Sequence, residues 1–462
     1  FHLFDLFRSA YESGNMAERN YVQDLNMNNQ LIEKTPPKMM NWKVLLTILT
    51  LAATLMSSSY TMLIPFLPVY LTKELGVTEH VNLWSGAVFS VTFLVSTFMA
   101  PIWGAMSDKG SRKLMAIRSA VLLSLAYTLG GLVQTPTQLF FVRVLQGIAA
   151  GLWPALLAIM SSNCPQQKLG ISMGIMQGAV TAGGVIGPLI GGVLAQYFGM
   201  RTSFFFGGAA LFTITMVIIL FVKDPPRKAA PKAVKTEEKK EKKPSLFKMP
   251  VIRGLLISAC LTQVSITLAM PIFTFYVAFL QGSEDNIVAL SGYVFAVLGI
   301  AGVIASPLWG WVGQTFSFKP VLLASMLFAG LFAVISAIPS TLDPFIVLRF
   351  IGGLAFASVF PSINALLTRY TPSTERGRAF GISFSFQQAG SIIGPLAGGA
   401  IASLLSLRAT MIAAGVVQII AFAYLWTKRK EFIENTATPA QGIPKSSVTR
   451  SQERKTEEVK QS

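Results

Sequence analysis

The feature that most constrains this chain is a series of long stretches that contain no Asp, Glu, Lys or Arg. Twelve such stretches occur in the 462 residues, and each approaches or exceeds the roughly 20 residues that a helix needs to cross a bilayer. Because backbone groups at membrane depth find no water, each stretch must be helical. We therefore expect an all-α integral membrane protein with twelve transmembrane helices. The stretches are 44–72, 81–107, 119–142, 144–167, 169–200, 202–222, 254–283, 286–318, 320–342, 350–368, 379–407 and 409–427.

Composition excludes several other classes of protein. Charged residues make up only 13% of the chain and hydrophobic residues 52%, which leaves too few charges for the surface of a soluble enzyme. Two cysteines cannot hold together a disulfide scaffold of this size, and two histidines do not suffice for a zinc site. The net charge of +17 comes from short clusters between apolar stretches, so we expect no nucleic-acid partner. We also expect no metal, no cofactor and no catalytic residue.

The distribution of Lys and Arg indicates which ends of the helices face the cytoplasm. If both termini are cytoplasmic, the outer loops contain only Lys73, Arg201 and Arg408 among the positive residues. Acidic residues show the opposite bias. We therefore expect a multi-pass protein with both termini in the cytoplasm. Its cytoplasmic loops would contain Lys109, Arg112, Lys113, Arg118, Lys168, Lys319, Arg369, Arg376 and Arg378.

A charged segment divides the chain near its middle. It is rich in Lys, Pro and Glu, as solvated linkers are. The first 26 residues lack the apolar core of a signal peptide, and we expect the native chain to begin near Met27. The predicted segments are a cytoplasmic N-terminal segment (1–42), a six-helix bundle (43–222), a charged linker (223–251), a second six-helix bundle (252–428) and a disordered cytoplasmic tail (429–462).

The two halves of the sequence repeat at an offset of 206 or 207 residues. APIWGAMSDKGSRK at 100–113 matches SPLWGWVGQTFSFK at 306–319, and GGVIGPLIGG at 183–192 matches GSIIGPLAGG at 390–399. A duplication of six helices places a substrate site where the halves meet, near the bilayer midplane, and lets the halves rock around that site. The repeat therefore predicts two pseudo-symmetric halves and transport by alternating access.

Three motifs carry a resemblance to a known family. They are Gly104-x-x-x-Asp108-x-x-x-Arg112, Arg143-x-x-x-Gly147 and Gly183-x-x-x-Gly187-Pro188-x-x-Gly191-Gly192. The first is similar to the loop signature of the major facilitator superfamily. The second and third resemble motifs in the fourth and fifth helices of its drug:proton antiporters, of the multidrug efflux type. The resemblance covers about 41–430 and implies the major facilitator fold in a bacterial plasma membrane.

The resemblance also implies roles for these residues. Asp108, with Gly104 and Arg112, would form a latch that closes the cytoplasmic side against the eleventh helix. The small residues of the third motif and of its repeat would let the two halves approach closely and slide. The predicted seam residues are Gly183, Gly187, Pro188, Gly191, Gly192, Gly394 and Pro395.

Arg143 and Arg349 are the charged residues that we expect inside spans. An unpaired Arg at the bilayer centre costs about 2.5 kcal/mol or more. Both side chains either reach the membrane surface or face the interior, and beside Arg143 the amide of Gln146 favours the second interpretation. Such cations would bias protonation or attract an anionic substrate. All 21 acidic residues lie outside the spans, so proton coupling follows from the resemblance alone and would use Asp108 or Glu74.

Aromatic residues and amides supply the candidate substrate contacts. The 33 Phe and 18 Met residues suit an adaptable binding surface, although most of them must pack in the core or face lipid. The candidates lie beside the prolines that break the first and seventh helices, or are amides expected in the interior. They are Tyr60, Phe66, Gln146, Gln263, Phe273, Tyr276, Gln387 and Gln388.

Together these features predict a secondary transporter and not an enzyme. We expect a monomer that exports amphipathic, drug-like substrates across the lipid bilayer in exchange for protons. The chain has no GxxxxGK[ST] run that would bind ATP. A narrow exporter of one metabolite or sugar remains an alternative, because no acidic residue is embedded. A membrane-embedded enzyme or sensor is the alternative of another class, although no catalytic constellation supports it.

Overall fold

The computed structural model describes residues 41–222, 246, 249–283, 285–371 and 375–429. Every regular element in these ranges is a helix, which confirms the all-α prediction. The elements are α2 (Trp42–Met62), α3 (Leu67–Lys73), α4 (Val81–Lys109), α5 (Arg112–Leu132), α6 (Pro136–Ala149), α7 (Leu152–Asn163), α8 (Gln166–Phe198), α9 (Met200–Phe221), α10 (Pro250–Leu268), the 3₁₀ turn η2 (Met270–Ile272), α11 (Phe273–Gln281), α12 (Ile287–Phe316), α13 (Phe318–Ile335), α14 (Leu342–Phe356), α15 (Val359–Tyr370), α16 (Arg376–Leu404) and α17 (Leu407–Thr427).

Eleven of the twelve predicted spans are long and apolar enough to cross a membrane, among the described residues. The twelfth, predicted at 379–407, forms α16, a helix of 29 residues. Its sequence includes two arginines in the first turn, Arg376 and Arg378, and the amides Gln387 and Gln388. Its length matches α4, which also has 29 residues, so the fold contains the expected twelve long helical units.

Four of these units are interrupted, and the interruptions lie at equivalent positions in the two repeated halves. The first unit is interrupted at Pro65 between α2 and α3, and the seventh at Pro271 in η2, as expected. The fourth is interrupted at Gly151, where φ is +117° and an L side chain would be strained. The tenth breaks at Ala357, 207 residues after Ala150, and these last two interruptions were not predicted from the sequence.

One predicted loop is wrong. The charges at 108–118 predict a loop between two spans, but α5 begins at Arg112, and only Gly110 and Ser111 separate it from α4. Ser111 caps α5, because its Oγ accepts a hydrogen bond from the backbone N–H of Leu114 at 3.0 Å. The prediction failed because it ended spans at the first charge, whereas a helix tolerates cations in its first turns. Arg118 therefore lies inside a span.

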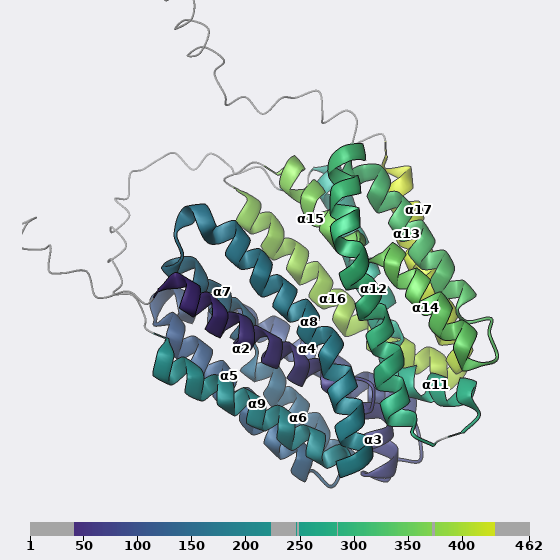
Figure 1. Cartoon of the computed structure of the whole chain (residues 1–462). Coiled ribbons are helices and arrows are strands. Elements are labelled where there is room, and N and C mark those ends of the chain that lie inside the picture. Colours follow the sequence, from purple (N-terminus) through teal and green to yellow (C-terminus); the bar gives the residue numbers. More distant parts are fainter. Residues whose placement is uncertain (1–40, 223–245, 247–248, 284, 372–374, 430–462) are drawn as a thin grey trace, which may run out of the picture.

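The helices pack around separate cores in the two halves of the chain. One core of buried apolar residues runs from Leu45 to Val222, and three others lie between Leu246 and Leu425. Figure 1 shows the corresponding bundles, α2–α9 and α10–α17. The exact limits of the predicted segments stay a prediction, because most of 1–42, 223–251 and 429–462 lies outside the described residues.

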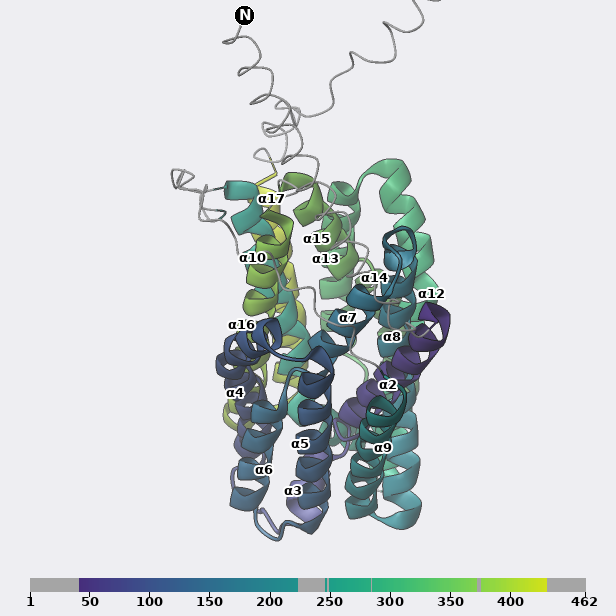
Figure 2. The ribbon, with the colours of Figure 1, turned by 90° about the vertical axis from the view of Figure 1, so that its left-hand side faces the viewer.

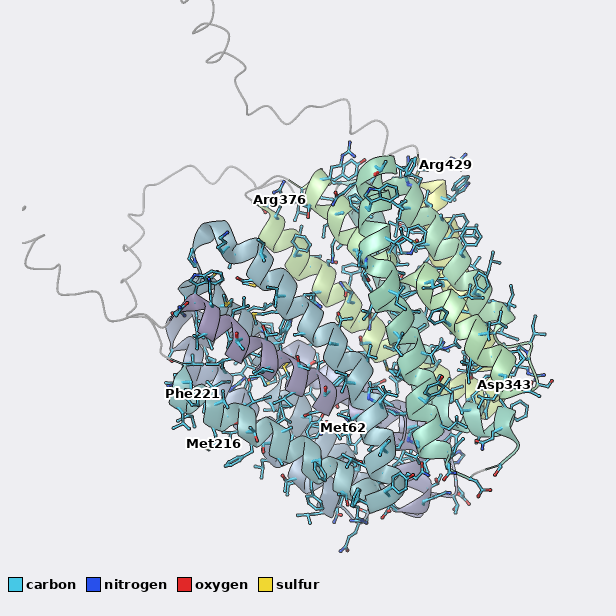
Figure 3. All side chains as sticks on the ribbon, viewed as in Figure 1. Met62, Met216, Phe221, Asp343, Arg376 and Arg429 are labelled. Carbon is cyan, nitrogen blue, oxygen red and sulfur yellow. The ribbon has the colours of Figure 1, made fainter. Side chains whose placement is uncertain are left out.

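The ends of the helices define two faces of the molecule. At one face, which we call the terminal face, α2 begins, α9 ends, α10 begins and α17 ends (Figure 1). At the other, which we call the distal face, the loops from α3 to α4 and from α11 to α12 turn. Figure 3 labels Phe221, Arg376 and Arg429 toward the terminal face and Asp343 toward the distal face.

The two bundles touch mainly through two pairs of helices, α4 with α16 and α8 with α12, and in addition α3 and α4 contact η2 and α3 contacts α11. Figure 2 shows these pairs on opposite sides of the molecule. A Cβ atom added at Gly86 of α4 would lie 2.5 Å from the carbonyl oxygen of Pro395, so the two backbones are in contact. Gly292 of α12 packs in the same way against the carbonyl of Pro188 in α8.

The contacts between the bundles extend from the distal face to about the middle of the molecule. Gly86 and Gly292 lie five residues, or about one and a half turns, from the distal ends of their helices. Gly104 and Gly310 follow 18 residues later, or about five turns along the same helix faces, where an added Cβ would meet nothing within 4 Å. The same spacing and the same contrast separate Gly192 from Gly174 and Gly399 from Gly381. The bundles therefore meet distally and diverge toward the terminal face (Figure 1).

Candidate functional site

The first element of the site is α6, which begins with a strong cap. Thr135 and Gln138 form a capping box, and Pro136 occupies the first helical position. Gly147 lets α6 approach α4 closely, because a Cβ there would lie 2.8 Å from the carbonyl oxygen of Thr92. Arg143 lies on the same side of the helix, one turn before Gly147.

Arg143 is buried in the first bundle, with only 4% of its surface exposed. Its Nη1 donates to Oε1 of Gln146 at 2.9 Å, while Nε and Nη2 have no partner among the described residues. The guanidinium lies 5.8 Å from the ring centre of Phe89. Tyr60 of α2 and Tyr127 of α5 lie close enough to interact electrostatically with the guanidinium. The burial of its side chain places Arg143 inside the first bundle, and its role as a cavity charge stays a prediction.

Arg349 occupies the matching position in the second bundle, on α14. Its guanidinium lies 5.3 Å from the ring centre of Phe273 and 5.9 Å from that of Phe345. Its Nε is buried without a partner among the described residues. Gly352 stands 206 residues after Gln146, so Arg349 has no amide neighbour at this position. The second cation is therefore surrounded by aromatic rings and lacks the partner of the first.

Arg118 is a third interior cation, which the sequence analysis assigned to a loop. It stacks on Trp103, 3.5 Å from the ring centre, and its Nη2 donates to the carbonyl of Ala150 at 3.0 Å. Nε1 of Trp103 donates to the carbonyl of Ile148 at 2.9 Å. The pair thus satisfies carbonyls at the end of α6, beside its break. The helix-start signal of Ser111 could have placed Arg118 correctly.

The described acidic side chains all lie at helix ends or in loops. Glu74 accepts a hydrogen bond from Nε of Arg201 at 2.9 Å, near the distal face. Glu375 pairs with Arg378 at 3.3 Å, near the terminal face. No described carboxylate pairs with the three interior arginines. Within the part of the chain that the structure describes, the interior is therefore positively charged.

The latch predicted at the end of α4 stays a prediction. The backbone of Asp108 lies in the last turn of α4, but its side chain lies outside the described part of the chain. Gly104 faces open space. Nη1 of Arg112 donates to the carbonyl of Ala158 in α7 at 3.0 Å, so Arg112 ties α5 to α7 inside the first bundle.

The predicted seam is wrong for part of the Gly-Pro motif. Gly183, Gly187 and Gly191 lie against Thr54, Ser58 and Met62 of α2, so they join α8 to its own bundle. Gly394 likewise lies against Thr267 of α10. Residues four apart share one helix face, and this face points into the bundle.

The other members of the motif do lie between the bundles. Pro188 contacts Gly292, and Gly192 contacts Ala289, both on α12. Pro395 contacts Gly86 of α4. The motif therefore places residues on two faces of one helix, because each residue is rotated by about 100° around the helix axis relative to the one before it.

The candidate substrate aromatics fall into two groups. Phe66 and Tyr276 are fully buried within their own bundles, where their rings pack on Phe204 and Phe345. This arrangement suits core packing and does not favour the predicted substrate role. Phe273 is also buried, but it lies beside Arg349. Tyr60, with 37% of its surface exposed, is the accessible member of the group.

The candidate amides already have protein partners. Gln263 donates to Oγ of Ser391 at 3.0 Å, and Gln387 donates to Oγ of Ser383 at 3.4 Å, on its own helix. Gln388 donates to Oγ of Ser96 at 3.1 Å, which links α16 to α4 across the two bundles. Their role in substrate binding stays a prediction.

Known proteins resemble this chain along most of its length. A family model described as Major Facilitator Superfamily matches residues 49–305 and 255–458. The chain is 31% identical over 407 residues to "Multidrug resistance protein MdtG" of Enterobacter lignolyticus (strain SCF1), covering 88% of this chain and 96% of that protein. It is 32% identical over 380 residues to the protein of the same name from Klebsiella pneumoniae (strain 342), covering 82% and 92%.

Solved structures resemble the fold. A bacterial homolog of the human lysosomal transporter Spinster, in an inward-facing and occupied conformation, superposes with a TM-score of 0.73. The match covers 86% of this chain and 99% of that chain, at 18% sequence identity, and therefore concerns the fold alone.

Proposed function

This chain belongs to the major facilitator superfamily of membrane transporters, and from that premise we propose that it is a secondary active multidrug efflux transporter. The proposal is supported by relatives that carry the name multidrug resistance protein over more than four fifths of the chain. A membrane transporter needs no catalytic constellation, and the family is one of transporters and not of enzymes.

The observation that carries the mechanism is the one-sided contact between the bundles. Four helices place pairs of glycines 18 residues apart on the face toward the other bundle, and only the distal glycine of each pair is in contact. A rocking motion that separates Gly86 from Pro395 would bring the opposite ends, near Gly104, together. This geometry supports alternating access, in which the interior arginines are exposed to each face in turn.

We further propose that the terminal face is cytoplasmic and that the membrane is a bacterial plasma membrane. The positive-inside bias supports this orientation, because Arg376 and Arg429 lie toward that face (Figure 3) and Nζ of Lys113 donates to the carbonyl of Ile219 near the end of α9. The transporter would then be open to the cytoplasm in the structure described here. We expect a monomer, as the separate cores of the two bundles complete the fold within one chain.

Proton coupling would involve carboxylates near the two faces of the molecule. The candidate carboxylates lie near opposite faces: Glu74 pairs with Arg201 near the distal face, and Asp108 ends α4 at the terminal face. Because Arg143 has no carboxylate partner among the described residues, a proton would bind a carboxylate near one of the two faces and not beside the buried Arg143. Substitution at each face separates the two routes.

The test uses purified protein in proteoliposomes and several chemically unrelated fluorescent amphipaths. We expect an imposed proton gradient to drive their movement in the native protein, and Asp108→Asn or Glu74→Gln to abolish the effect of the gradient. Arg201→Gln is the matched control, because it breaks the same ion pair and keeps the carboxylate. Movement that ignores the gradient would exclude proton antiport. Movement of a single compound, without competition by the others, would favour the narrow exporter of one metabolite or sugar.

A further inference from the structure

The interior of this transporter contains cations that lack acidic partners. Arg118, Arg143 and Arg349 lie within helical units, while the described carboxylates stay near the two faces. Asp108 ends α4 about 24 Å along that helix from Thr92, the neighbour of Arg143. We propose that the substrate site takes the anionic group of an amphipathic substrate, and that Arg349 is the residue that binds it. The inference rests on the proposed export function and names its substrate class.

Arg349 is the interior arginine with the most free donors. Arg143 donates to Gln146, and Arg118 donates to Ser119 and to Ala150. No hydrogen bond or ion pair from Arg349 is found among the described residues, and its Nε is buried. A guanidinium has five N–H donors in a planar fork that fits carboxylates, sulfonates and phosphates. An anion would therefore satisfy donors that the protein leaves unpaired.

The rings beside Arg349 define the rest of the ligand. Phe273 and Phe345 flank the guanidinium, and Phe295 of α12 packs edge-on against Phe273 at 5.5 Å. Phe273 and Phe345 are at most 1% exposed, so the guanidinium lies on the bundle interior and does not reach along lipid to the surface. Cations bind ring faces weakly and keep their in-plane donors free. These two buried rings therefore hold the guanidinium in place, whereas Arg349 and Phe295 are partly exposed and could contact the anionic group and the hydrophobic body of an amphipathic anion.

A cationic substrate would meet repulsion at the same place. Two unit charges about 6 Å apart, at an effective dielectric constant of about 20, change a binding equilibrium by about a hundredfold. For an anion the same field is attractive, and the buried Arg143 adds to it. Gly352 supplies no amide at the position equivalent to Gln146, so the guanidinium of Arg349 keeps its donors free. We therefore expect the anionic group to bind in the second bundle.

The experiment compares two fluorescent probes with one aromatic body. Anilinonaphthalene sulfonate is an anion, and phenylnaphthylamine is its neutral counterpart without the sulfonate. Binding to the purified protein in detergent is measured for the native chain and for Arg349→Gln, Arg349→Lys and Arg253→Gln. Arg253 is an exposed arginine of the same bundle and serves as the matched control.

We expect Arg349→Gln to weaken binding of the sulfonate at least about tenfold and to change binding of the neutral probe less than about twofold. Arg349→Lys keeps the charge and should restore part of the affinity, and Arg253→Gln should have no effect. Equal losses for both probes, or no loss for the sulfonate, would overturn the inference. If Arg349→Gln does not fold, the native protein and Arg349→Lys are compared with ethidium as a cationic competitor, and equal competition by ethidium overturns the inference.

A transport assay distinguishes failure of this inference from failure of the proposed function. Gradient-driven export of ethidium and of the neutral probe, without the sulfonate, would leave multidrug export intact and exclude an anionic preference. Binding of the sulfonate that depends on Arg349, without movement of any probe, would support the anion site and exclude efflux.

Discussion

At the scale of single residues, Arg118 and Trp103 act as one clamp on the end of α6. Both donate to carbonyls that the helix break at Gly151 leaves without an intrahelical partner. Because α6 also positions Arg143, the clamp joins the terminal end of α4 to the interior cation. The second bundle keeps only part of this arrangement, since Trp309 donates to the carbonyl of Leu354 at 2.7 Å. Ala324 stands 206 residues after Arg118.

This difference predicts unequal costs for the same substitution. Trp103→Leu and Trp309→Leu each remove an indole hydrogen bond, but only the first also removes a stacked guanidinium. We expect Trp103→Leu to lower the free energy of unfolding by about 1 kcal/mol more than Trp309→Leu. Unfolding in detergent measures both. In an Arg118→Gln background the difference should vanish, and its persistence would show that the stacking contributes nothing.

The interior arginines also show which side-chain positions could be predicted from the sequence. Arg143 and Arg349 were predictable, because turn residues precede each of them and apolar residues follow. Arg118 was not predictable from a rule that ends each span at its first charge, because α5 includes three cations in its first two turns. The core positions of Phe66 and Tyr276 were not predictable for another reason: rotation of a helix about its axis decides whether a residue faces the core or a ligand, and composition does not encode this rotation.

At the scale of elements, α8 and α16 each serve two neighbours. One glycine face packs on α2 or α10, and the adjacent face, with its proline, packs on the opposite bundle. The repeat and the small residues made close packing predictable from the sequence. Which face meets which helix was not predictable, because adjacent positions in one motif point to different partners. The distal contact depends on glycine, since any side chain at Gly292 would meet the carbonyl of Pro188.

This dependence predicts that Gly292→Ala separates the bundles at the distal face. Gly310→Ala is the matched control, since it lies on the same helix face and meets nothing within 4 Å. With Cys164 and Cys260 replaced by Ser, a reporter at Ser90→Cys lies in the contact, where Ser90 donates to the carbonyl of Ile392. We expect an impermeant maleimide to label the reporter several-fold faster in Gly292→Ala and at the native rate in Gly310→Ala. A slower rate in Gly292→Ala would contradict the role of this contact.

At the scale of the whole molecule, two helix pairs, α4 with α16 and α8 with α12, form the seams between the bundles. The register of each pair can be continued beyond the observed contacts. α4 and α16 run antiparallel, with Gly86 beside Pro395 and Ser96 beside Gln388. Continued toward the terminal face, this register places Gly104 opposite Gly381. In the other seam Gly299 lies beside Val185, and the continued register places Gly310 opposite Gly174. The proposed alternating access therefore predicts that these open glycines form the contacts of a second conformation, closed at the terminal face.

Cysteine pairs test that second conformation. In a background without Cys164 and Cys260, we expect Gly104→Cys with Gly381→Cys to form a disulfide only when the bundles close at the terminal face. The bond requires Cα atoms about 4.4–6.8 Å apart, so it reports a close approach of backbones. The disulfide should stop transport, and reduction should restore it. The mismatched pair Gly104→Cys with Gly310→Cys joins different seams and should not form a bond. A bond in the mismatched pair, or transport that continues with Gly104 and Gly381 linked, would contradict closure by rocking of two rigid bundles.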